Sequence, residues 1–298
     1  MLKVDNVTKY YGPLKAVDDL SFSVKPGDVF GLLGVNGAGK TTTFRIIMGL
    51  LDFDGGEVTL DGEKIDYSVT DKIGFLTEER SLLTKLTVME QAIYYGILKG
   101  MTEEKVEKEL DKWLIRFGIV DYKHRKIKEL SKGNQQKIQF ITAIINEPKL
   151  LILDEPFSGL DPINVEMFKE VIKELEKKGS MIIFSSHRME HIELFCDKIV
   201  VLVEGKSVLK GSIKDIKKEY RKKNILIKGD IDKTKLEKIK GVLKIIKKSD
   251  EYEVKIEDEK YIKDVFDYTT TCDNVTKFVV EEPSLNEIFV SRVGEKYE

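Results

Sequence analysis

Short apolar stretches alternate with turns in the first 60 residues, and this pattern predicts β-strands. Leu20–Val24 and Glu57–Leu60 have strand composition, and turns rich in glycine, proline and aspartate separate them. Between them, Val29–Gly34 (VFGLLG) is apolar without alternation and runs into a glycine loop. Such a run is typical of a central parallel strand buried on both faces. We therefore expect Val29–Gly34 to lie inside a parallel sheet.

From Val88 to about Leu130 the apolar residues follow a helical period. They recur at steps of three and four residues, at Val106, Leu110, Trp113, Leu114 and Phe117. Thr102 is suited to cap a helix that begins with two acidic residues. We expect this stripe, Trp113 included, to be core.

Strands and helices then alternate. The apolar runs Leu150–Leu153 (LLIL) and Met181–Phe184 (MIIF) flank a helical stretch around Val165–Lys178. This order predicts a mostly parallel sheet. Ile199–Val203 and Ser207–Leu209, joined by a Glu-Gly turn, predict a hairpin.

A charged stretch without apolar period, Lys217–Lys223, suggests a domain boundary. Beyond it the pattern predicts the order β-α-β-β-α-β, which is that of ferredoxin-like α+β modules. The expected strands are Ile225–Ile227, Val242–Ile246, Tyr252–Ile256 and Phe278–Val280, and the expected helical segments are Lys233–Ile239, Lys260–Phe266 and Leu285–Val290. We expect two domains, 1–217 and 222–298.

Composition narrows the class of protein. The 298 residues have a net charge of −2, which disfavours a nucleic-acid partner held by bulk charge. The two cysteines, Cys196 and Cys272, form no disulfide framework, and we expect both to be packed thiols in a reducing compartment. The N-terminus does not resemble a secretory leader, and no apolar run approaches the roughly 18–20 residues of a membrane helix. We expect a cytoplasmic chain, to which another polypeptide supplies any membrane span.

Gly34–Thr41 (GVNGAGKT) fits the pattern G-x-x-x-x-G-K-[ST] in full. Glycines allow the loop to turn sharply, so that its N–H groups surround phosphates. Lys40 supplies a positive charge to the β- and γ-phosphates, and the Thr41 hydroxyl can ligate Mg²⁺. A helix over about Thr42–Met48 would direct its N-terminal dipole at the anion. The remaining loop positions expected to contact the nucleotide are Gly34, Asn36, Gly37, Ala38, Gly39 and Thr42.

Two acidic residues end the LLIL strand. Asp154 is placed to hold Mg²⁺ through water, and Glu155 to orient or deprotonate an attacking water. Taken alone, a solvated strand end is the simpler interpretation, but the phosphate loop upstream favours the catalytic one. Upstream again, Leu130–Gln135 (LSKGNQ) precedes a helix; Ser131 suits a cap, and Gly133 permits close approach to a phosphate.

Together these motifs resemble the nucleotide-binding domain of ABC ATPases, over roughly residues 1–215. Gly34–Thr41 is similar to the Walker A motif, Leu150–Glu155 to Walker B, and Leu130–Gln135 to the LSGGQ signature. Ser158–Asp161 resembles the D-loop, His187 the switch histidine, and Tyr11 the aromatic residue that stacks on adenine. The resemblance implies a P-loop NTPase fold with a mostly parallel core sheet, an N-terminal antiparallel β subdomain and a helical subdomain over about 82–147.

The sequence departs from the family pattern at two places. Glu78 stands where the family usually has glutamine; a carboxylate can still ligate Mg²⁺ but cannot donate a hydrogen bond when ionised. Lys132 replaces a signature glycine and adds a positive charge near the expected phosphate. His191, four residues after His187, could share a helical face with it, but a third ligand for zinc is not evident.

The resemblance also implies partners and a mechanism. Two such domains pair head to tail, so that ATP and Mg²⁺ lie between the Walker A loop of one and Ser131 and Gly133 of the other. The chain is then one subunit of a homodimer or of a pair with a homologue, on the inner face of the cell membrane through integral membrane subunits. Pro283–Phe289 resembles the end of the accessory domain of exporter-type members. The resemblance therefore implies the ATP-hydrolysing subunit of an ABC membrane transporter, and of an exporter in particular. The alternative is a non-transport ABC ATPase acting on ribosomes or nucleic acid.

Overall fold

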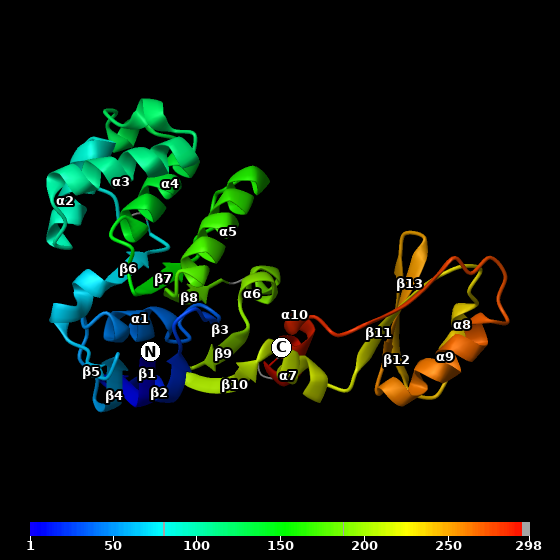
Figure 1. Cartoon of the computed structure of the whole chain (residues 1–298). Helices are drawn as coiled ribbons and strands as arrows, with labels where there is room; N and C mark the ends of the chain where they lie inside the picture. Colours follow the sequence, from blue (N-terminus) through cyan, green and yellow to red (C-terminus); the bar gives the residue numbers. More distant parts are fainter. Residues whose placement is uncertain (80, 187, 294–298) are drawn as a thin grey trace. The chain divides into compact units, whose positions relative to one another are not determined.

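The computed structural model describes residues 1–79, 81–186 and 188–293 (Figure 1). Two compact units make up the chain, Met1–Gly211 and Ser212–Glu298. Each unit is built on a sheet of its own.

One mixed sheet organises the first unit. Its strands in the described part of the chain are β1 (Leu2–Tyr11), β2 (Leu14–Val24), β3 (Val29–Gly34), β4 (Gly55–Leu60), β5 (Glu63–Lys64), β6 (Ile73–Leu76), β7 (Leu150–Asp154), β8 (Met181–Ser185), β9 (Lys198–Val203) and β10 (Lys206–Ser212). They lie in the order β5-β4-β1-β2-β10-β9-β3-β8-β7-β6. β9, β3, β8, β7 and β6 are parallel neighbours, whereas β5, β4, β1 and β2 pair antiparallel. The predicted parallel core with an antiparallel β region is confirmed.

Side-chain caps fix where most helices of this unit begin. The helices are α1 (Lys40–Ile47), α2 (Val88–Leu98), α3 (Glu103–Arg116), α4 (Lys132–Ile144), α5 (Pro162–Lys177) and α6 (Met189–Phe195). Thr102 and Ser131 accept hydrogen bonds from the first turns of α3 and α4, as their sequence positions predict. Asp161 caps α5, and Pro162 occupies its first position. Figure 1 shows α2, α3 and α4 gathered beyond β6 and β7.

Aromatic packing ties these helices to the sheet. Phe140 of α4 and Phe168 of α5 stack with ring centroids 4.3 Å apart, and Phe117 meets both edge-on. Phe157 continues the cluster to Phe184 of β8. The rings of this cluster are buried, and the helical stripe that includes Trp113 is core as predicted. Such pairs add about 0.5–1.5 kcal/mol each beyond the burial of their area, so α4 and α5 are held firmly to each other.

The second unit contains a four-stranded antiparallel sheet in the order β12-β13-β11-β14. Its elements are α7 (Ile213–Glu219), β11 (Lys223–Lys228), α8 (Lys233–Leu236), β12 (Val242–Lys248), β13 (Glu251–Ile256), α9 (Ile262–Thr269), β14 (Lys277–Glu281) and α10 (Leu285–Val293). β11 to β14 with α8 and α9 give the predicted β-α-β-β-α-β order of a ferredoxin-like module. α8 is a single turn, shorter than the pattern predicts. Its one buried residue, Leu236, joins a small core with Ile225, Val254 and Val265.

No helix in the described residues is both long enough and apolar enough to cross a bilayer.

Candidate active site

A pocket of about 1130 Å³ opens at the carboxyl ends of β3 and β7. This is the edge of a parallel sheet at which ligands of open α/β folds bind. The structure brings together here the predicted residues Tyr11, Gly34, Asn36, Gly37, Gly39, Lys40, Thr41, Thr42, Glu78, Asp154 and Glu155. Ala38 lies buried within the loop and does not line the pocket.

The glycine loop between β3 and α1 requires its glycines. Gly37 and Gly39 have φ of +82° and +104°, a region that L side chains rarely adopt. Lys40 begins α1, and its ammonium donates to the carbonyl oxygens of Gly34 (2.7 Å) and Val35 (3.3 Å). The first N–H groups of a helix have no partner within the helix, so those of α1 and the Lys40 charge lie together at an anion site.

Alanine at Gly39 is expected to damage the loop more than alanine at Gly37. A Cβ at Gly39 would lie 2.4 Å from the Ala16 carbonyl oxygen, whereas a Cβ at Gly37 would meet no atom within 4 Å. Gly37→Ala should therefore cost only the left-handed strain of about 1 kcal/mol. Gly39→Ala should lose about 1–3 kcal/mol more through overpacking. Urea unfolding of both variants measures this difference, and equal midpoints would contradict the close approach of Ala16 to the loop.

Two carboxylates follow one another at the end of β7. The Ser185 hydroxyl of β8 donates to Asp154. Burial raises the pKa of Asp154, although the hydrogen bond from Ser185 lowers it. The nearby Glu78 carboxylate raises this pKa further, and the Lys40 ammonium lowers it. Asp154 is thus a buried acid whose charged form needs a cation.

Glu155 has a left-handed backbone, with φ of +50°. Its N–H donates to the Ser185 carbonyl oxygen at 3.1 Å, and the Ser186 hydroxyl donates to its Oε2 at 3.2 Å. A non-glycine residue in this conformation is uncommon and is found at active sites when the surrounding contacts hold it. These two hydrogen bonds place the Glu155 carboxylate in the pocket beside Asp154.

The donor set in the pocket fits Mg²⁺. Thr41, Glu78 and Asp154 present a hydroxyl and two carboxylates to the same space, and Mg²⁺ in phosphate sites is bound by one or two carboxylates plus the phosphates. In the described residues no group of three or more His, Cys, Asp or Glu could hold a metal by itself. A bound Mg²⁺ would take its remaining ligands from the phosphates and from water.

Tyr11 ends β1 at the rim of the pocket. Its side chain is 44% exposed, and the Lys9 ammonium lies 5.8 Å from the ring centroid. An aromatic face that is open to the pocket can stack on a base.

Six lining residues were not predicted: Leu14, Lys15, Ala16, Val35, Glu204 and Gly205. The sequence showed Glu204-Gly205 only as a hairpin turn, and no local signal joins Ala16 to the loop.

Besides Ala38, two predicted contact residues, Ser131 and Gly133, do not line this pocket. Ser131 is exposed and accepts a hydrogen bond from Asn134 N–H at 3.3 Å as the cap of α4. Gly133, in the first turn of α4, approaches Gly159 and Leu160. The chain therefore holds the Walker-type loop and the signature-type residues at separate places. The predicted switch residue His187 lies outside the described residues.

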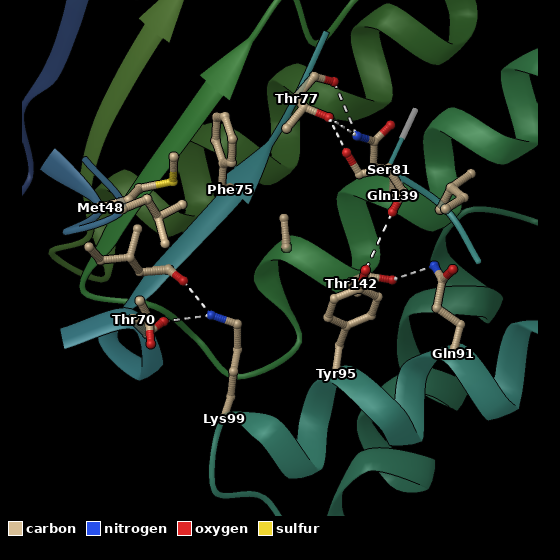
Figure 2. Close-up of a pocket in the computed structure, with 14 residues that line it drawn as sticks. Met48, Thr70, Phe75, Thr77, Ser81, Gln91, Tyr95, Lys99, Gln139 and Thr142 are labelled. Carbon is tan, nitrogen blue, oxygen red and sulfur yellow. Dashed lines mark hydrogen bonds between the residues drawn. The ribbon is translucent and has the colours of Figure 1, made fainter. Parts of the chain in front are cut away.

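A second pocket, of about 390 Å³, lies between the sheet edge and α2 and α4 (Figure 2). Its lining is mostly apolar, with contributions from Phe75 of β6, Tyr95 of α2 and Ala143 of α4. Lys99 is largely desolvated here, and this burial lowers its pKa; its ammonium donates to the carbonyl oxygens of Thr70 (2.8 Å) and Ile73. Thr77 and Ser81, on either side of Glu78, also line this pocket.

The glycine loop between a buried parallel strand and a helix, with acidic residues ending the neighbouring strand, defines a P-loop nucleoside triphosphatase. A family model described as ABC transporter matches residues 17–158, and one described as ATP-binding protein DrrA1-3-like, C-terminal domain, matches 211–293. The chain belongs to the ABC transporter ATP-binding proteins, and it is an ATPase.

Relatives extend the family match to the whole chain. The uncharacterized ABC transporter ATP-binding protein YhaQ of Bacillus subtilis is 47% identical over 298 residues, all of both chains. The linearmycin resistance ATP-binding protein LnrL of the same species is 36% identical, over 72% of this chain and 70% of LnrL. The lipopolysaccharide export system ATP-binding protein LptB of Haemophilus influenzae is 30% identical, over 76% of this chain and 97% of LptB. These names favour a transporter subunit over the non-transport alternative.

Solved structures of ABC transporter ATPases are also similar to this chain. The dimeric structure of MJ0796, a bacterial ABC transporter cassette, superposes with a TM-score of 0.66 at 26% identity, covering 72% of this chain and 99% of that one. The structure of cbiO1 from Clostridium perfringens, part of the ABC transporter complex cbiONQ, gives 0.64 at 30% identity, covering 73% and 90%.

Proposed function

We propose that two copies of this ATPase, or one copy and a homologue, close around ATP to complete the active site. The observation that carries this proposal is the position of Ser131 and Gly133, outside the pocket that contains Lys40 and Glu155. A second subunit can supply these two residues to the exposed side of the bound phosphates. The dimeric structure of the related MJ0796 cassette supports the pairing.

We assign each of these pocket residues a separate role in ATP hydrolysis. Tyr11 stacks on the base, while the loop N–H groups and Lys40 hold the phosphates. Thr41, Glu78 and Asp154 would hold Mg²⁺, which neutralises charge on the phosphates when bound. Glu155 accepts a proton from the attacking water, and this step is worth about 10²–10⁴-fold in rate. The proposed role of His187, to contact the γ-phosphate, is carried over from the family pattern.

We further propose that the transporter exports its substrate and that this chain is peripheral on the inner face of the membrane. Linearmycin resistance and lipopolysaccharide export in the names of two relatives support this direction. The membership of cbiO1 in a larger transporter complex supports separate membrane subunits. The closed dimer would then transmit the energy of ATP binding and hydrolysis to these subunits.

The surface that we assign to the membrane subunit is the exposed apolar face of α2, together with the second pocket. Tyr94, Ile97 and Leu98 are 50%, 52% and 63% exposed on this helix. Exposed apolar residues grouped in this way mark interaction surfaces. Thr77 and Ser81 in the pocket wall flank Glu78, so a partner bound here lies close to the nucleotide site.

Purification of the tagged chain from membranes tests this assignment. A multi-span protein that raises its ATP turnover should co-purify, and Ile97→Glu should abolish that capture because it places a charge on an apolar interface. Ile115→Glu, on an exposed position of α3, is the matched control and should retain the partner. If the parent chain recovers no multi-span protein, the transport assignment fails; if Ile97→Glu retains it, only the surface is wrong.

A further inference from the structure

Helix α4 contains buried glutamines whose side-chain amides donate hydrogen bonds to backbone carbonyls beside the nucleotide site. The first is Gln136, which is 2% exposed. Its Nε2 donates to the carbonyl oxygen of Pro156 at 3.0 Å. Pro156 directly follows Glu155, so this hydrogen bond fastens α4 to the segment that carries the proposed general base.

The second is Gln139, which is 5% exposed and lies one turn further along α4. Its Nε2 donates to the carbonyl oxygen of Thr77 (3.1 Å), to the Thr77 hydroxyl (3.0 Å) and, more weakly, to the carbonyl oxygen of Glu79 (3.5 Å). Figure 2 shows the amide directed at Thr77. The two carbonyls belong to the residues on either side of Glu78. One amide group is therefore hydrogen-bonded to the backbone before and after the proposed metal ligand.

The neighbours of Gln139 fix the orientation of its amide. Backbone carbonyls only accept hydrogen bonds, so the nitrogen has to face Thr77 and Glu79. The amide oxygen Oε1 is left buried and has no hydrogen-bond partner in the described part of the chain. A buried acceptor without a partner costs stability, and an apolar side chain would avoid that cost. The contribution of Gln139 therefore lies in its donor, which holds the backbone on both sides of Glu78.

We propose that Gln136 and Gln139 are positioning residues, which make the placement of Glu155 and Glu78 depend on the position of α4. Residues three apart lie on one side of a helix, so a rigid shift of α4 moves both amides together. Ser131 caps the start of the same helix. A second subunit that engages Ser131 therefore acts on the start of α4 and, through the two amides, on both carboxylates. This inference rests on the proposed roles of Glu78 and Glu155.

The test replaces each glutamine by methionine, which keeps the length of the side chain and removes the donor. Gln139→Met should lower kcat about tenfold and reduce by a similar factor the binding of Mg²⁺ to the ATP complex, as for the loss of a residue that supports a metal ligand. Metal binding is read as the rise in Tm that Mg²⁺ adds to ATP, compared with ATP in EDTA. Gln136→Met should lower kcat about tenfold as well, but should leave KM and that Mg²⁺-dependent rise unchanged.

Asn146→Leu is the matched control, because it also removes an amide that donates to a backbone carbonyl. The Asn146 Nδ2 donates to the carbonyl oxygen of Asp71 at 2.7 Å, its Oδ1 is buried without a hydrogen-bond partner among the described residues, and Asn146 lines neither pocket. This variant should leave kcat and the Mg²⁺-dependent rise in Tm at parent values. Equal losses in all three variants, in step with a lower Tm without nucleotide, would show a purely structural role and overturn the proposal.

The Glu78→Ala background separates this inference from the proposed function. If Glu78→Ala does not change the Mg²⁺-dependent rise in Tm, the metal role of Glu78 is wrong. If Glu78→Ala changes it, Gln139→Met should produce no further change in that background, since both act through one group. Additive changes would refute the positioning role of Gln139 alone. Gln139→Leu is a second variant without a donor, and it should reproduce Gln139→Met.

Discussion

Glu155→Gln is expected to abolish ATP turnover and leave ATP binding intact. The amide has the shape of the carboxylate and can still accept the hydrogen bond from Ser186, but it cannot take a proton from water. We expect kcat to fall by about 10²–10⁴-fold, the usual contribution of a general base. Because ATP remains bound, the variant should accumulate as an ATP-stabilised dimer. Steady-state kinetics and size-exclusion chromatography with ATP measure the two effects.

Glu170→Gln provides the control for this substitution. Glu170 is an exposed glutamate of α5 that does not line the nucleotide pocket, so the same chemical change there should leave kcat within about twofold, as for surface substitutions. Parent activity in Glu155→Gln would refute the general-base role. A monomer in the presence of ATP, with turnover abolished, would retain that role but count against the proposed closed pair.

Lys40→Ala is expected to remove ATP binding rather than turnover alone. The ammonium donates to two loop carbonyls, Gly34 and Val35, and it is the cation that a bound polyphosphate would meet. Loss of one partner from a desolvated charge pair costs about 2–5 kcal/mol. At about 1.4 kcal/mol per factor of ten, ATP affinity should fall by about 10²-fold or more. Calorimetric titration with ATP measures the change.

Lys149→Ala is the corresponding control, because Lys149 is an exposed lysine whose ion pair is with Asp61, outside the pocket. Its loss should leave ATP affinity unchanged, since exposed ion pairs contribute little. If Lys40→Ala binds ATP as the parent does, the loop is not the phosphate site. A loss confined to kcat would instead make Lys40 important for the reaction and not for binding.

The chemistry of the pocket is largely predictable from sequence because local rules govern it. Gly34–Thr41 follows a buried strand, and Asp154 and Glu155 end another, so parallel packing brings both to one edge of the sheet. The separation of Ser131 from this pocket also agrees with the pairing that the family resemblance implies. The division between sheet and helical region follows from a change of apolar period at Val88.

Contacts between segments that are far apart in the sequence are harder to predict from it. β6 (Ile73–Leu76) has four residues, one of them Gly74, and becomes a strand because it pairs with β7 far along the chain. A Cβ at Gly74 would lie 2.2 Å from the Ala143 carbonyl oxygen, so the close approach of α4 depends on this glycine. No local signal in the sequence shows that contact.

The burial of the α4 glutamines is likewise hard to predict from the sequence. In the segment Gln135–Gln139 (QQKIQ), polar residues outnumber apolar ones, a composition typical of a solvated surface. Gln136 and Gln139 are nevertheless buried, because backbone carbonyls of two distant loops meet the helix there. Buried polar side chains of this kind become visible only when the partners of their hydrogen bonds are known.

The position of Ser131 and Gly133 outside the nucleotide pocket has a consequence for mass action. In the proposed pair a complete active site is itself a complex of two chains. For the isolated ATPase at low concentration, the number of complete sites then rises with the square of the protein concentration, so turnover per chain is not constant. Membrane subunits that hold two copies side by side replace this dependence by an effective local concentration, which for short tethers reaches the millimolar range. Assembly with the transporter would then by itself set how fast each chain hydrolyses ATP.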